Sequence, residues 1–421
     1  MEHKTKVTQS ALPLLAKCLT WECLLFVAAL AFLVPFSPLR NINIQGLILI
    51  LAGATGWLAV LLRRPLGLKV HARPVLILGA IYVLSILISL AFSPYFSYGL
   101  LGLPYVRLGA AGLLACLGCG LCLETIQTKR LITGLYYLTC AFAVTSVVYT
   151  WLHFHSLIRI GGLFSQADLF AVIVGCGFLL GVHLYASHAK NRLLLGILQI
   201  ILGVLLICSE TRAVIGLVTI ILGVWLLRER AHWSVRRLLL LALISVLALG
   251  VLTVVVPKRI TNVSYGTEST RYRLELQEFG LSQALKEPLW GYGPGDLPDV
   301  LGCNHIKAPM LIQTCREGYF FNSTHNIFLD RILMFGWIGG LAFVCLIATV
   351  MYRAYKSPDT PIVLVFCTLL ILLYYLTNVT NIEVELLLCV LLCHISFSYS
   401  RRPYKTFIRK QGLQAKAENT N

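Results

Sequence analysis

The stretch from Gln166 to Ala186 reads QADLFAVIVGCGFLLGVHLYA. It carries one acidic residue, Asp168, near its start, and almost every position after it is apolar. A transmembrane helix needs about 20 mostly apolar residues. The stretch therefore predicts a membrane-spanning helix with Asp168 close to one membrane surface.

Runs of the same kind recur through the rest of the 421 residues. By the same length criterion there are about twelve, which predicts an all-α polytopic membrane protein with about twelve transmembrane helices. The other runs lie near Cys18–Pro35, Ile42–Leu62, Val75–Phe92, Leu108–Leu123, Leu131–Leu152, Leu193–Cys208, Ala213–Leu227, Leu238–Val256, Ile327–Met351, Ile362–Leu376 and Val384–Phe397.

The overall composition agrees with a membrane protein. Hydrophobic residues make up 58% of the chain and charged residues 13%, and the mean hydropathy is +0.80. A soluble domain is typically about 45–50% apolar and about 25% charged. The composition thus excludes a soluble enzyme, a disordered protein and a fibrous repeat.

The formal net charge of +17 has a topological explanation. In a soluble protein such an excess would suggest a nucleic-acid partner, but in a membrane protein it indicates positive cytoplasmic loops. With the N-terminus inside, every short inside connection is basic, and each short outside connection carries at most a single Arg. We therefore predict that both termini are cytoplasmic, and we expect no nucleic-acid partner.

The chain is predicted to be a single integral membrane domain, 1–421, with one large outer loop at 257–326. Acidic and basic side chains balance in that loop, so it is no polycationic patch. If the loop lies outside the cytoplasm, Cys303 and Cys315 could form a disulfide within it.

A helix is expected inside this loop, over Ser269–Leu285. Its leucines have helical spacing, so that Leu274, Leu281 and Leu285 could share one face, and Pro288 stops the helix. We interpret it as a short helix that lies at the outer membrane interface.

Ionisable residues near the outer ends of the spans need an explanation, because charges within spans are costly and mark candidate functional sites. Any single one could snorkel to the interface or belong to an Asp–Arg pair satisfied between helices. Several arginines beside one outer loop would instead form an anion site, since guanidinium groups match phosphate oxygens. A phosphate site at the lipid–water boundary suggests a lipid-linked phosphate or diphosphate substrate. The residues concerned are Arg107, Arg159, Asp168, Arg212, Asp330, Arg331, Glu383 and Glu385.

His325 is the outer histidine beside the start of a span. A histidine can act as a general base near neutral pH. The structural alternative is a residue at the start of a helix that Ser323 or Thr324 caps.

Four stretches, in this order, resemble the O-antigen ligase/polymerase superfamily of bacterial membrane glycosyltransferases. They are Arg159-Ile160-Gly161-Gly162-Leu163-Phe164 followed by Asp168; Ser209-Glu210-Thr211-Arg212-Ala213; Arg273-Leu274-Glu275-Leu276 leading into Pro288-Leu289-Trp290-Gly291-Tyr292-Gly293-Pro294-Gly295; and His325-Asn326 with Leu329, then Phe335-Gly336-Trp337-Ile338-Gly339-Gly340. The chain departs from the family pattern at Gln166-Ala167-Asp168, at Gln277 and at Met334-Phe335.

The resemblance implies a GT-C-like fold and a ligase that moves a glycan from undecaprenyl diphosphate to a lipid A–core sugar hydroxyl, without metal, nucleotide or other cofactor. The reaction would take place at the periplasmic face of the bacterial inner membrane, where the large loop lies. Arg212 and Arg273 match family arginines that would hold the diphosphate, and His325 matches the histidine that would orient or deprotonate the acceptor hydroxyl. Further substrate-binding residues are predicted at Arg159, Asp168, Arg271 and Asn326.

Other functions remain open at this point. A polymerase of the same family would join two lipid-linked repeat units, and a related enzyme would transfer the glycan to a protein. A transporter would favour charged or broken helices at the membrane midplane and repeated halves, whereas the ionisable residues here map to the outer face. A structural scaffold would leave the arginines and His325 unexplained.

Overall fold

A computed structural model of the chain describes sixteen segments of it. The described residues are 15–27, 42–62, 73–102, 109–124, 126–154, 167–187, 191–229, 263–286, 289–294, 297–302, 309–316, 321, 323–357, 360–376, 378 and 382–398. The predicted span Leu238–Val256 and the residues Arg107 and Arg159 lie outside them.

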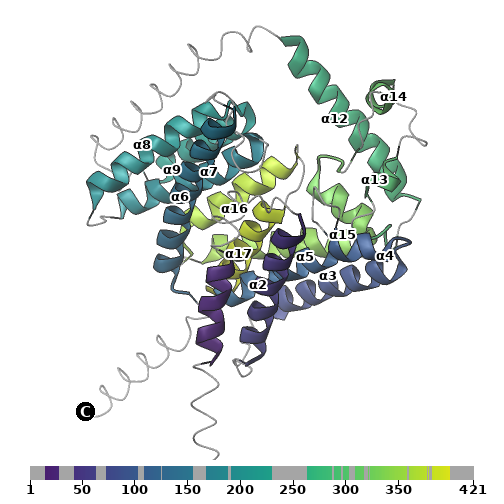
Figure 1. Cartoon of the computed structure of the whole chain (residues 1–421), viewed down its shortest axis with the longest axis horizontal. Coiled ribbons are helices and arrows are strands. Elements are labelled where there is room, and N and C mark those ends of the chain that lie inside the picture. The colour runs from purple at the N-terminus through teal and green to yellow at the C-terminus, as the bar shows by residue number, and fades with distance from the viewer. Residues whose placement is uncertain are drawn as a thin grey trace, which may run out of the picture.

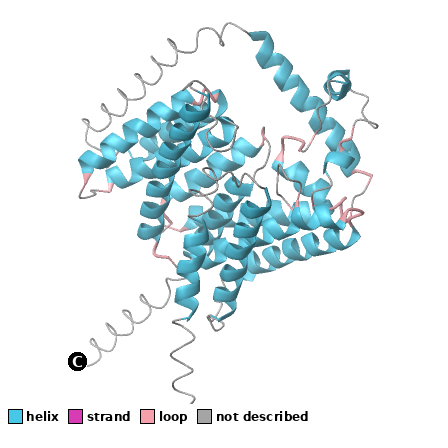
Figure 2. Cartoon of the chain, in the orientation of Figure 1, coloured by secondary structure: helices cyan, strands magenta, loops and turns pink. Residues whose placement is uncertain are grey.

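Regular structure within these segments is entirely helical (Figure 2). A first helix covers 15–27. The others are α2 (Ile42–Leu62), α3 (Arg73–Phe92), α4 (Phe96–Leu101), α5 (Ala110–Leu123), α6 (Thr128–Phe154), α7 (Ala167–Ala186), α8 (Arg192–Cys208), α9 (Arg212–Glu229), α12 (Val263–Ala284), α13 (Leu297–Val300), α14 (Pro309–Arg316), α15 (Ile327–Lys356), α16 (Ile362–Tyr375) and α17 (Ile382–Ser398).

Four described helices are long and apolar enough to cross a membrane: Arg73–Phe92, Thr128–Leu152, Ala167–Ala186 and Ile327–Lys356. Shorter apolar helices occupy further predicted runs, at Leu47–Leu62, Ala110–Leu123, Arg192–Cys208, Ile362–Tyr375 and Val384–Phe397. The helical membrane architecture is thereby confirmed, and the total of about twelve spans stays a prediction.

Helix α7 lies at the centre of one group of helices, where α6, α8, α9 and α16 pack around it (Figure 1). Small residues permit this close packing. A Cβ atom added at Gly177 would lie 2.3 Å from the Thr139 side chain, and one added at Gly181 would lie 2.0 Å from Gln199 Oε1. Because α7 begins at Ala167, this packing fixes the position of Asp168 at the end of the group.

A second group forms around α5, which contacts α2 on one side and α17 on another, while α15 packs on α3. Backbones approach closely here too, since a Cβ atom at Gly56 would lie 2.6 Å from the Gly118 carbonyl oxygen. Helix α17 also contacts α16 and α7, so it joins the two groups.

The two ends of α17 meet different partners. Near its start, Glu385 pairs with Arg331 in the first part of α15. Near its end, His394 Nε2 lies 2.9 Å from Thr128 Oγ1 at the start of α6. The start of α15 and the start of α6 thus lie at opposite ends of α17, as the predicted alternation of the spans requires.

Helix α12 confirms the helix expected in the large loop. Leu276 and Ala284 are buried on its inner side, while Leu274, Leu281 and Leu285 are 55%, 45% and 65% exposed. The inner side packs on α15, as Figure 1 shows at the upper right. The exposed leucines form the apolar face predicted to meet the membrane interface.

Candidate functional site

The loop before α15 holds His325 in an uncommon backbone conformation. His325 has φ of 58° and lies in the left-handed region, which costs energy for a residue with a Cβ atom. The side chain of Asn326 caps the helix instead of Ser323 or Thr324, because its oxygen accepts from Phe328 N at 3.1 Å and from Leu329 N at 3.3 Å. The alternative interpretation, in which Ser323 or Thr324 caps the helix, is therefore wrong about the capping residue.

The His325 imidazole is half-buried beside α12. Its ring lies edge-on to the Tyr272 ring, with centroids 6.2 Å apart. Its Nδ1 atom is buried and has no hydrogen-bond partner among the described residues. Burial and the positive charge of Arg273 lower the pKa of His325 to about 4. The imidazole is therefore neutral at physiological pH.

Asp330 fixes the two residues that precede His325. Its buried carboxylate accepts hydrogen bonds from Ser323 Oγ at 2.6 Å, Thr324 N at 2.8 Å and Thr324 Oγ1 at 2.7 Å. Ser323 Oγ in turn accepts from His325 N at 3.0 Å. Asp330 thus holds the loop that carries His325 through these hydrogen bonds.

Arg331 points away from that loop into the protein. It forms an ion pair of 2.6 Å with Glu385, and both side chains are almost completely buried. Its guanidinium also lies over the rings of Phe335 and Phe343, at 5.9 and 5.5 Å. For Arg331 the explanation is therefore pairing between helices. Its partner is Glu385 and not Asp330.

Helix α15 is interrupted at Gly336, which has φ of 69° and ψ of 178°. The span predicted near Ile327–Met351 is found within α15, and Gly336 breaks the helix inside it. The carbonyls of Leu333 and Met334, which the break leaves without helical donors, accept from Tyr292 N at 2.8 Å and Gly293 N at 3.1 Å. Ser89 Oγ also donates to Met334 O.

The predicted turn around Gly291 consequently packs against the break. A Cβ atom at Gly336 would lie 1.9 Å from the Leu289 carbonyl oxygen, and one at Gly291 would lie 2.5 Å from Gly336 N. Gly291 also has a positive φ, of 71°. Two stretches that the sequence analysis singled out separately thus form one joint, in which glycine is required on both sides.

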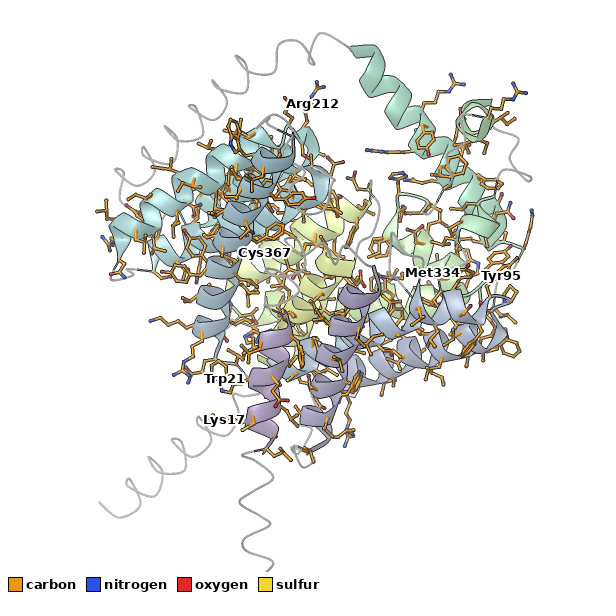
Figure 3. All side chains as sticks on the ribbon, in the orientation of Figure 1. Lys17, Trp21, Tyr95, Arg212, Met334 and Cys367 are labelled. Carbon is orange, nitrogen blue, oxygen red and sulfur yellow. The ribbon has the colours of Figure 1, made fainter. Side chains whose placement is uncertain are left out.

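Asp168 and Arg212 belong to a second part of the site. Thr211 Oγ1 donates to Asp168 Oδ1 at 3.1 Å, which ties the start of α9 to the start of α7. Glu210, the residue before Thr211, is in a left-handed conformation, with φ of 53°. The side chain of Arg212 is exposed and projects from the start of α9 (Figure 3).

Tyr374 lies close to charged residues of both parts of the site, the Asp168 part and the His325 part. The charges of Asp168 and of Arg273 both act on its hydroxyl group, and Arg273 acts on His325 as well. Tyr374 is buried near the end of α16. The starts of α7 and α9, the end of α16, helix α12 and the His325 loop are therefore brought to one region.

Sequence reasoning overlooked Tyr374 and Tyr272. The only signal for Tyr374 was a polar hydroxyl near the end of an apolar run, and Tyr272 stood next to the singled-out Arg273. Neither signal reveals which helices meet.

The other predicted site residues are placed as follows. Arg271 is exposed and pairs with Glu275 on its own helix, at 3.1 Å. Asn326 uses its side-chain oxygen in the cap described above. Their assignment to substrate binding stays a prediction. Cys315 is disulfide-bonded, and Cys303, its expected partner, lies outside the described residues.

Comparison with protein families identifies the region that holds Arg212, Arg273 and His325. Residues 197–344 match the family model described as O-antigen ligase. This stretch is therefore similar to the O-antigen ligase family. The matched residues cover most of α8, helices α9, α12, α13 and α14, the His325 loop, and the part of α15 that includes the Gly336 break. No curated protein sequence matches the chain.

Proposed function

We propose that the protein is an O-antigen ligase that transfers a glycan from undecaprenyl diphosphate to a sugar hydroxyl of lipid A–core. The observation that carries this proposal is the half-buried His325, held in a left-handed loop beside the cationic Arg273, within the stretch that matches the O-antigen ligase family. A base and an anion-binding group are the two parts that such a transfer needs side by side.

In the proposed reaction the acceptor hydroxyl oxygen attacks the anomeric carbon of the glycan. Its proton passes to the His325 imidazole as the new carbon–oxygen bond forms. The bond between the anomeric carbon and the diphosphate breaks, and its electron pair leaves with undecaprenyl diphosphate. Direct displacement of this kind inverts the anomeric configuration, so NMR of the product linkage should show inversion, and retention would refute this step.

The arginines serve the leaving group in this proposal. Arg273 lies beside His325, and Arg212 projects from the start of α9, next to the Thr211–Asp168 contact. Guanidinium groups bind phosphate oxygens two at a time, and their charge stabilises the diphosphate as it departs. The catalytic roles thus fall to His325, Arg212 and Arg273, with Asp168 holding the loop that presents Arg212.

The location follows the same reasoning. The disulfide at Cys315 supports an oxidising compartment for the large loop, because disulfides persist in the periplasm and not in the cytosol. We therefore propose a multi-pass protein of the bacterial inner membrane, with the site on its periplasmic face and both termini in the cytoplasm.

The break in α15 does not support a transporter. Interrupted helices in transporters leave backbone carbonyls free to coordinate ions. Here the carbonyls of Leu333 and Met334 are bonded by Tyr292 N, Gly293 N and the Ser89 hydroxyl. The break holds a loop of the same chain.

Purified protein in nanodiscs tests the proposal directly. It would receive undecaprenyl-diphosphate-linked glycan with and without lipid A–core, beside a His325→Ala variant of confirmed fold. A product ladder that needs both lipid A–core and His325 is the expected result. Longer chains on undecaprenyl diphosphate without that acceptor would identify a polymerase instead. No product in either reaction from folded protein would overturn the ligase and direct the search to a protein acceptor.

A further inference from the structure

The buried carboxylate of Asp330 accepts hydrogen bonds from the loop before α15 and forms no ion pair with a described residue. Its exposed fraction is 0%, and its three hydrogen bonds all come from Ser323 and Thr324. A buried carboxylate with well-aligned donors is held rigidly, because leaving any of these groups unpaired is costly. The loop before α15 is therefore attached to the helix that follows it.

The attachment continues to His325 through one further bond. Ser323 Oγ donates to Asp330 Oδ2 at 2.6 Å and accepts from His325 N at 3.0 Å. His325 is in the left-handed region, a conformation that persists only when surrounding contacts enforce it. The bonds from Asp330 through Ser323 and Thr324 supply such contacts.

The part of α15 that carries Asp330 is itself fixed on two sides. The next residue, Arg331, pairs with Glu385 of α17, and the far end of this part is bonded to Tyr292 and Gly293 at the break. Because Arg331 is paired with Glu385, the Asp330 carboxylate makes its hydrogen bonds with Ser323 and Thr324 of the loop.

We propose that Asp330 is the positioning residue of His325, holding the imidazole in place for the acceptor hydroxyl through Ser323 and Thr324. The proposal rests on the function proposed above, since it presumes that His325 takes the acceptor proton. Asp330 itself is fully buried and its oxygens are occupied, so it touches no substrate. Its removal should lower the rate of the chemical step and leave donor binding at the arginines unchanged.

Asp330→Asn provides the sharpest test. The site presents three donor groups, and an amide offers one acceptor oxygen in place of two, so the bonds cannot all be kept. Small misplacement of a catalytic group costs up to about a hundredfold in rate. We expect kcat per folded protein to fall by about tenfold to about a hundredfold, with KM for the lipid-linked donor within about twofold of the wild type.

Ser323→Ala supplies a second variant if Asp330→Asn does not fold. It removes the one hydroxyl that contacts both Asp330 and His325 and keeps the Thr324 bonds. We expect a smaller fall in kcat, again without a change in KM for the donor. In the double variant the losses should not multiply, because both residues act through the same bonds.

Two control variants separate positioning from general damage. Glu278→Gln changes an exposed carboxylate on α12 and should leave kcat unchanged. Gly56→Ala brings a Cβ atom to 2.6 Å from the Gly118 carbonyl oxygen, far along the chain from the His325 loop. It should lower the unfolding temperature while kcat per folded protein is kept.

The inference is overturned if Asp330→Asn, or Ser323→Ala where the former does not fold, retains wild-type kcat per folded protein. It is equally overturned if the change appears in KM for the donor alone. His325→Ala, measured in the same assay, keeps this distinct from the proposed function. Normal transfer by His325→Ala would remove the base itself, whereas a dead His325→Ala beside a normal Asp330→Asn would remove only the positioning role.

Discussion

Arg331 and Glu385 form a buried ion pair, 54 positions apart in the chain, that joins α15 to α17 at 2.6 Å. Nε, Nη1 and Nη2 of Arg331 and Oε2 of Glu385 have no hydrogen-bond partner of good geometry among the described residues. The pair is therefore held by charge and by the aromatic rings of Phe335 and Phe343. It anchors the part of α15 that follows His325.

Removal of one partner should destabilise the protein more than removal of both. An uncompensated buried charge typically costs about 3–5 kcal/mol, whereas replacement of the whole pair by apolar residues is often close to neutral. We predict that Arg331→Met and Glu385→Leu each lower the unfolding temperature in detergent, and that the double variant recovers most of the loss. Additive losses in the double variant would show that the two charges do not depend on each other.

The pH dependence of transfer should report the unusual histidine. Since the pKa of His325 lies at about 4, the acid limb of kcat/KM for wild-type protein is expected well below the ordinary value of about 6.5. In the complex with the donor, the negative diphosphate favours the imidazolium, so the acid limb of kcat should lie at higher pH than that of kcat/KM. Initial rates between about pH 3 and about pH 8 would cover both limbs.

The same lowered pKa affects stability. Between about pH 6.5 and about pH 4 the unfolded chain binds the proton at His325 and the folded protein does not, so acidification through this window should destabilise the fold. His325→Asn should lose that part of the pH dependence. An identical dependence of unfolding temperature on pH in the two proteins would contradict the assignment.

Gly336→Ala should disrupt the joint between α15 and the turn at Gly291. The added Cβ atom would lie 1.9 Å from the Leu289 carbonyl oxygen, at a residue with φ of 69°. We expect a loss of at least about 2 kcal/mol of unfolding free energy, or its equivalent in unfolding temperature. Gly223→Ala is the matched control, because nothing lies within 4 Å of a Cβ atom there, and it should be neutral or slightly stabilising.

The arginines should be distinguishable from other cations of the same region. Arg273→Gln and Arg212→Gln are expected to weaken use of the lipid diphosphate donor by about tenfold or more in kcat/KM. Lys286→Gln, at the end of α12, removes an exposed cation whose Nζ atom lies 3.0 Å from Gln283 Oε1, and should have little effect. Equal effects of all three variants would assign the arginines to packing or topology.

Much of this architecture could be predicted from apolar runs. The opening stretch Gln166–Ala186 corresponds to α7 at Ala167–Ala186, and the loop helix expected over Ser269–Leu285 is found within α12, at Val263–Ala284. Length and hydropathy determine such elements locally, so a sequence is sufficient to predict them.

The parts that could not be predicted depend on distant contacts or on backbone angles. The break at Gly336 is invisible to hydropathy, because the residues on both sides of it are apolar. The pairing of Arg331 with Glu385, and the effect of Tyr374 on the site, depend on which helices become neighbours. His325, Arg273 and Arg212 could be singled out by residue type and by resemblance, but the bonds from Asp330 to Ser323 and Thr324 required the folded loop.

The interruption at Gly336 divides α15 into two pieces that have different surroundings. The piece before Gly336 is attached to the turn at Gly291, because the carbonyls of Leu333 and Met334 accept hydrogen bonds from that turn. It is also attached to α17, because Arg331 pairs with Glu385. The piece after it carries exposed apolar side chains such as Ile338 and Leu341, which suit contact with lipid. A change of bilayer thickness would therefore act first on the second piece, and the bonds at the break and to Glu385 keep the first piece, with the His325 loop, attached to the protein.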